Sequence, residues 1–126
     1  MLQFYEELAT YERDGLTIII DKTHEDMHPR DSFDDSCHDI DEICKDIDCG
    51  NMVWFMLRVR VLVEGLELAS EYLGGCLYED PREILTDGTA EDIIEMALDH
   101  AKSQVYRLSR VFAGLSEQVD RERADA

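Results

Sequence analysis

The chain of 126 residues carries 30 acidic and 12 basic side chains, which gives a formal net charge of −18. A surface this negative repels nucleic acids and anionic membranes and speeds encounters with basic proteins, so direct binding to DNA or RNA is disfavoured. Apolar residues make up 44% of the sequence. That share is enough for one folded domain over residues 1–126 and argues against global disorder.

The sequence also indicates the cellular compartment that we expect for the protein. The longest apolar run, residues 52–57, is too short for a transmembrane helix, and no secretory leader or lipidation signal is visible. The four cysteines form no Cys-x-x-Cys pair. We therefore expect reduced thiols in a cytoplasmic protein.

The first half of the chain predicts one strand between two helices. Residues 2–13 suit a short amphipathic helix that ends at Asp14-Gly15, although their tyrosines would also suit a strand. Residues 16–23 contain three consecutive isoleucines and predict a strand. Pro29 is expected to keep the next loop non-helical as far as Asp31, where a helix over residues 31–50 begins.

The second half predicts a hairpin followed by helices. Residues 52–63 alternate strictly and predict a strand whose core face carries Val53, Phe55, Leu57, Val59, Val61 and Val63. Glu64-Gly65 turns the chain into a return strand, in which Gly74-Gly75 marks a bulge. A short helix after Pro81 and a long helix from about residue 89, frayed over about residues 120–126, complete the chain.

These elements together predict the α+β class. The expected architecture is a three-stranded antiparallel sheet with helices packed on one face, in the order (α)βαββαα.

The acidic stretch from Asp31 to Gly50 is the most unusual part of the sequence. At helical spacing, Asp35, Asp39, Glu42 and Asp46 line up along one edge. Like charges at these spacings each cost about 0.2–0.5 kcal/mol, so the row indicates a surface meant for a cationic partner. Helical positions four apart rise about 6 Å, close to the spacing of neighbouring phosphates on a nucleic-acid strand. The candidate partner-binding residues are Glu25, Asp26, Asp31, Asp34, Asp35, Asp39, Asp41, Glu42, Asp46 and Asp48.

Catalytic and metal chemistry have weaker support. His24 and His28 are four residues apart, but Pro29 disfavours the helix that would bring them together on a metal. The sequence has no Gly-x-Ser-x-Gly motif and no glycine-rich phosphate loop. We therefore predict a non-enzymatic protein with no metal and no cofactor.

Two further patterns leave alternatives open. Arg58 and Arg60 share a strand face, and we interpret them as cross-strand partners of Glu67 and Glu71 rather than as a nucleic-acid platform. Three lysines against nine arginines in so acidic a chain would also suit salt adaptation, although salt adaptation should spread the acids evenly.

The last helix carries an apolar seam whose members alternate steps of four and three: Ile94, Leu98, Ala101, Val105, Leu108, Phe112, Leu115 and Val119. The seam favours packing on the sheet over a coiled coil. However, a helix of about 26 residues is roughly 39 Å long, which is more than a three-stranded sheet covers. A homodimer formed through Val105, Leu108, Phe112 and Leu115 is therefore a further hypothesis, and with it an acidic adaptor or interaction domain.

The acidic helix DSFDDSCHDIDEICKDID, with Glu25-Asp26 before it and Glu79-Asp80 later, resembles the acidic faces of small inhibitors encoded by phages and mobile elements. These are the anti-CRISPR and anti-restriction DNA mimics, which share character rather than a sequence motif. The resemblance implies a protein, in the host cytoplasm if phage-encoded, that binds a basic nucleic-acid-binding complex. A CRISPR effector or a restriction enzyme would then have its nucleic-acid groove blocked.

Overall fold

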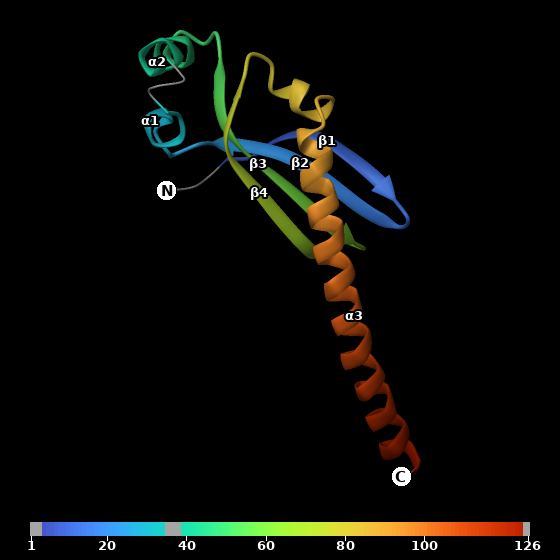
Figure 1. Cartoon of the computed structure of the whole chain (residues 1–126). Coiled ribbons are helices and arrows are strands. Elements are labelled where there is room, and N and C mark those ends of the chain that lie inside the picture. The colour runs from blue at the N-terminus through green and yellow to red at the C-terminus, as the bar shows by residue number, and fades with distance from the viewer. Residues whose placement is uncertain (1–3, 35–38, 125–126) are drawn as a thin grey trace.

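The computed structural model describes residues 4–34 and 39–124, which form an antiparallel sheet and a long C-terminal helix (Figure 1). The α+β class is therefore confirmed. The elements in chain order are β1 (Glu6–Arg13), β2 (Leu16–His24), α1 (Pro29–Ser32), α2 (Ile40–Asp48), β3 (Val53–Val63), β4 (Leu66–Tyr78), the 3-10 helix η1 (Pro81–Leu85) and α3 (Thr89–Ala124).

The sheet has four strands in the order β1-β2-β3-β4, and not the three we predicted. The additional strand is β1, which occupies the segment predicted as a helix. Asp14 and Gly15 have φ values of 52° and 81°, the backbone of a type I′ hairpin turn, so this dipeptide joins two strands instead of ending a helix. Glu64 and Gly65 form the same kind of turn between β3 and β4, as predicted.

The core lies between β2, β3 and β4 and one face of α3. The predicted inward face of β3 is confirmed, because Phe55, Leu57, Val59 and Val61 are all buried. Ile18 and Ile20 of β2 complete this layer. The pairing of β3 with β4 shifts between Phe55 and Leu57, opposite residues 73–76, which confirms the bulge at the glycine pair.

The other face of the sheet holds a buried ion cluster. Arg58 donates through Nε and one Nη to the two carboxylate oxygens of Asp21, at 2.8 and 2.6 Å, and Arg60 contacts the same carboxylate at 3.4 Å. The partner predicted for these arginines was therefore wrong. The acid comes from β2, where Asp21 pairs directly with Arg58, and not from Glu67 or Glu71 on β4.

The acidic segment differs most from our prediction, because it is not one helix over residues 31–50. A first short helix, α1, already begins at Pro29, and α2 begins at Ile40. Asp39 is the N-cap of α2, with its carboxylate accepting from the Glu42 amide at 3.1 Å, so the helix that ends at Asp48 does not begin at Asp31. Gly50 follows the end of α2 with φ 82°, the stop that we predicted.

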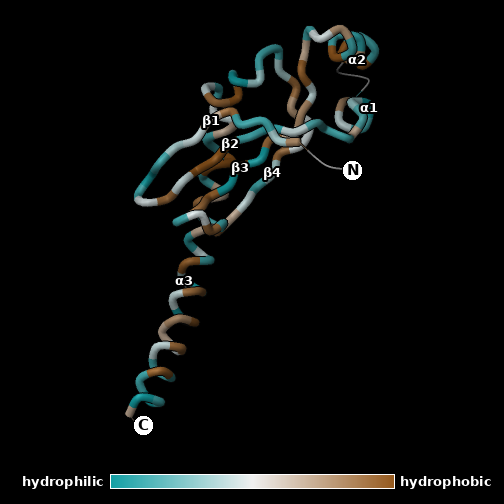
Figure 2. Tube along the Cα trace, turned by 180° about the vertical axis from the view of Figure 1, so that it is seen from behind, coloured by the Kyte–Doolittle hydropathy of each residue, from teal (hydrophilic) through white to brown (hydrophobic). Residues whose placement is uncertain are grey.

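Helix α3 is much longer than the sheet that it crosses. Its 36 residues extend roughly 54 Å at 1.5 Å per residue. Ala90, Ile93, Ile94, Ala97 and Ala101 are buried, and every described residue beyond Ala101 is exposed except the half-buried Gln104 and Leu108. The helix continues through residues 120–124, where we expected fraying. Figure 2 shows apolar residues recurring along this projecting part.

Candidate acidic docking surface

The predicted site lies at one end of the sheet, between the end of β2 and the start of β3 (Figure 1). Both of these strands are central in the sheet, and His24 at the end of β2 pairs with Phe55 near the start of β3. Both ends of the acidic segment are therefore held by core strands. Residues 25–48 contain ten acids and two bases, Arg30 and Lys45.

Trp54 holds this segment against the sheet. Its indole nitrogen donates to the Met27 carbonyl at 2.7 Å, and its ring lies 5.7 Å from the ring of Phe33. The side chain is only 6% exposed, so it acts as the base on which the loop rests. Ile40 of α2 is also buried.

Glu25 has a structural role that sequence reasoning missed. One carboxylate oxygen accepts from the Met27 amide at 3.0 Å, and the other accepts from the Gly75 amide on β4, also at 3.0 Å. A Cβ at Gly74 would lie 2.9 Å from this carboxylate, and one at Gly75 would lie 3.3 Å from the Trp54 ring. The glycine pair therefore lets the acidic loop approach the sheet closely, a further reason for glycine beyond the predicted bulge.

The other described acids of the predicted site are exposed, apart from the half-buried Asp46. Several are nevertheless engaged within the protein. Asp41 forms an ion pair with Arg30, and Asp39 caps α2. The described part of the predicted site that faces solvent comprises Asp26, Asp31, Asp34, Asp39, Asp41, Glu42 and Asp48. Asp35 lies outside the described residues.

The straight row of carboxylates is therefore corrected to a cluster. Because α2 starts only at Ile40, Glu42 and Asp46 are the two members of the row that share a helical edge. The other described acids come from the loop after β2, from α1 and the residues after it, from the N-cap, and from Asp41 and Asp48 at other positions on α2. A one-dimensional match to phosphate spacing over four helical positions no longer applies.

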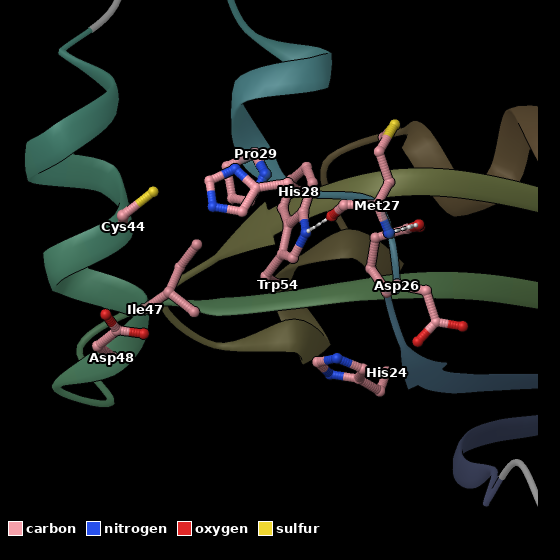
Figure 3. Close-up of a pocket in the computed structure, with 10 residues that line it drawn as sticks. His24, Asp26, Met27, His28, Pro29, Cys44, Ile47, Asp48 and Trp54 are labelled. Carbon is pink, nitrogen blue, oxygen red and sulfur yellow. Dashed lines mark hydrogen bonds between the residues drawn. The ribbon is translucent and has the colours of Figure 1, made fainter. Parts of the chain in front are cut away.

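A hollow of about 250 Å³ opens between α2 and the loop after β2 (Figure 3). Cys44 and Ile47 of α2 lie on one side of it, with Trp54 and the Met27–Pro29 segment opposite, and His24 and the carboxylates of Asp26 and Asp48 contribute to its lining. An apolar base with an acidic border suits the aliphatic stem and charged end of a lysine or arginine side chain.

The two histidines that we considered as metal ligands, His24 and His28, both line the hollow. The Nδ1 of His28 accepts from the Arg30 amide at 3.1 Å and caps α1. Residues 4–34 and 39–124 contain no group of three or more side chains suited to bind one metal ion.

The described cysteines are free thiols: Cys44 lies at the hollow, Cys49 is exposed and Cys76 is buried on β4. Burial raises the pKa of the Cys76 thiol to about 11, so it remains protonated at neutral pH. Cys76 is therefore not poised as a nucleophile.

The predicted oligomerisation residues lie elsewhere, on the projecting part of α3. Leu108 contacts the edge of the core, whereas Val105, Phe112 and Leu115 are exposed. The fold therefore separates the acidic segment from the apolar seam. None of the described helices is long and apolar enough to cross a membrane.

Comparisons with known proteins add no relative. The chain matches no protein-family model, no curated protein and no solved structure.

Proposed function

We propose that the protein is a non-enzymatic inhibitor whose acidic end occupies the basic nucleic-acid-binding groove of another protein, as a CRISPR effector or restriction enzyme would present. The observation that carries the proposal is a dense set of exposed carboxylates mounted on a fixed base. Residues 25–48 hold ten acids against two bases, and one of those bases, Arg30, is paired with Asp41.

The mounting matters because a mimic needs its charges in place before binding. Two hydrogen bonds attach the acidic loop to the sheet, from Trp54 of β3 to the Met27 carbonyl and from the Gly75 amide of β4 to Glu25. A third, from the Met27 amide to Glu25, holds the loop itself. Preorganised charges avoid the entropy cost of ordering a flexible acidic tail. Charge complementarity would also accelerate encounter and make the affinity sensitive to salt.

The clustered geometry alters how mimicry would work. Carboxylates from a loop and two short helices present a patch instead of a line, so the partner would be recognised by the overall field of its groove. The hollow beside Trp54 would receive one lysine or arginine side chain of the partner.

The test is affinity capture from a bacterial lysate at low salt on the immobilised full chain, followed by elution with duplex DNA or RNA oligonucleotides. If this protein binds in the partner's nucleic-acid groove, the oligonucleotide should release the partner, because the oligonucleotide and this protein compete for the same groove. A partner that stays bound would favour the acidic adaptor hypothesis.

Charge-reversed variants locate the surface. Asp31→Lys, Glu42→Lys and Asp48→Lys together should abolish capture, since all three side chains are exposed on the acidic segment. The control reverses Glu95, Asp99 and Glu117, which are exposed on α3 and change the net charge equally. Equal loss in both triple variants would show a general charge effect and contradict the proposal.

A further inference from the structure

The apolar face of α3 continues well beyond the sheet. About 23 residues follow Ala101, which is roughly 34 Å of helix. Along this length Val105, Phe112, Leu115 and Val119 are 45%, 61%, 55% and 38% exposed, on the same side of the helix that packs on the core. An aligned row of exposed large apolar side chains on a helix marks a contact surface.

The residues beside this row indicate what covers it. The positions that flank the apolar seam are uncharged: Gln104, Ser109, Val111, Ser116 and Gln118. Within residues 104–119 the charged side chains are Arg107, Arg110 and Glu117, and none of them occupies the seam or these flanking positions. The next seam position, Glu122, is charged, so the uncharged strip ends at Val119. This uncharged strip offers a basic partner no carboxylate to bind. It also lets a second copy of this chain, with its net charge of −18, approach without repulsion between acidic side chains at the contact.

We infer that two copies of this chain pair through the projecting part of α3 in antiparallel orientation. A parallel pair is excluded by the sheet, which lies on the seam side of the same helix at Ala97 and Ala101. Two parallel helices would therefore force both sheets into one space. In the antiparallel pair, Phe112 of one copy meets Leu115 of the other, and Leu108 meets Val119, under two-fold symmetry.

The end of the sheet completes this arrangement. A hollow of about 220 Å³ lies where α3 leaves the sheet, lined by Leu66, Glu67, Leu68, Gln104, Arg107 and Leu108. The C-terminal end of the second helix would reach this level. Leu66, which is 59% exposed, would be covered.

The contact is small. One face of the free helix offers fewer than the roughly 20–30 residues a side of a standard interface, so the dimer should dissociate on dilution. The acidic segment lies at the end of the sheet away from the projecting helix (Figure 1), so the dimer presents two acidic ends far apart. This inference stands whether or not the acidic end blocks a nucleic-acid groove.

The experiment measures the mass of the full chain by sedimentation equilibrium over about a hundredfold range of concentration. Reducing agent is present, because Cys49 is exposed and could link copies by a disulfide. We expect the mass to rise from 14.5 kDa toward twice that value. A mass that stays at one chain throughout the range would overturn the inference.

Variants test the surface. Phe112→Glu with Leu115→Glu should give a monomer at every concentration while the circular dichroism of the fold is kept, since both side chains are solvent-exposed in the single chain. The matched control is Tyr106→Glu with Arg110→Glu, on the outer side of the same helix, which should remain dimeric. A dimer that survives the seam variant would contradict the proposed contact.

Discussion

Asp21→Asn should destabilise the fold more than any other single charge removal on the sheet. Asp21 is 3% exposed and accepts two hydrogen bonds from Arg58 and one long contact from Arg60. Asparagine has nearly the same shape but no charge, so two guanidinium groups would keep their positive charge on a partly buried face without the anion that offsets it.

The magnitude follows from the burial of the pair. Breaking a fully buried ion pair by neutralising one member costs about 3–5 kcal/mol. The side chains of Arg58 and Arg60 are 16% and 26% exposed, so water reaches them in part. Arg58 also lies over the Tyr5 ring at 3.4 Å, a contact that the substitution leaves in place. We therefore expect a loss of about 2–3 kcal/mol in the free energy of unfolding.

The assay is urea unfolding at pH 7 followed by circular dichroism, with a double-mutant cycle that includes Arg58→Met. If the pair is coupled, the double variant loses less than the sum of the two single losses. The comparison is Glu91→Gln, which removes the exposed ion pair with Arg13 and should cost less than about 1 kcal/mol. A loss for Asp21→Asn no larger than that for Glu91→Gln, or an additive cycle, would refute the argument.

Three other outcomes follow from the same structure. Since burial raises the pKa of Cys76 from 9.0 to about 11, the folded state keeps this proton longer than the unfolded state, so stability should be unaffected below about pH 9 and fall between pH 9 and 11. The urea midpoint of Cys76→Ser should lack this part of the pH dependence. Gly75→Ala should cost more than Gly65→Ala in the same assay, because both have positive φ but only Gly75 would bring its Cβ within 3.4 Å of neighbours. Trp54→Phe removes the hydrogen bond to the Met27 carbonyl and should speed amide exchange over residues 25–34 while leaving β2 and β3 protected.

The sequence predicted secondary structure best where one hydrophobic periodicity continued through a whole element. The alternation in β3 and the turn at Glu64-Gly65 predicted the central hairpin and its inward face, because a strand with one buried side has a single workable register. The four-three spacing of α3 predicted the long helix. It also indicated that the helix extends beyond the sheet, because the predicted helix was longer than the sheet is wide.

The first strand was missed because the apolar residues of segment 2–13 suit the periodicity of a helix as well as that of a strand. The signal that could have found it is Asp14-Gly15 itself, a dipeptide with a strong preference for two-residue hairpin turns. In the acidic segment, the helical spacing of the acids concealed the break between α1 and α2. There the signal is Asp39 followed three residues later by Glu42, the pattern of a helix start.

The buried pair of Asp21 with Arg58 could not have been assigned from the sequence. Glu67 and Glu71 are on the strand next in the chain, so proximity favoured them. The actual partner depends on how β2 aligns with β3 across a separation of 37 residues, and that alignment is set by the whole sheet.

The pairing of His24 with Phe55 gives the acidic segment an unusual freedom. The acidic segment connects two residues that face each other on adjacent strands. Such a connection can change in length or sequence with little effect on the strands, because the entropic cost of loop closure rises only slowly with length. Trp54, which contacts Phe33 and the Met27 carbonyl, would then need a new cover. The sheet and its long helix would then stay the same while the acidic segment varied.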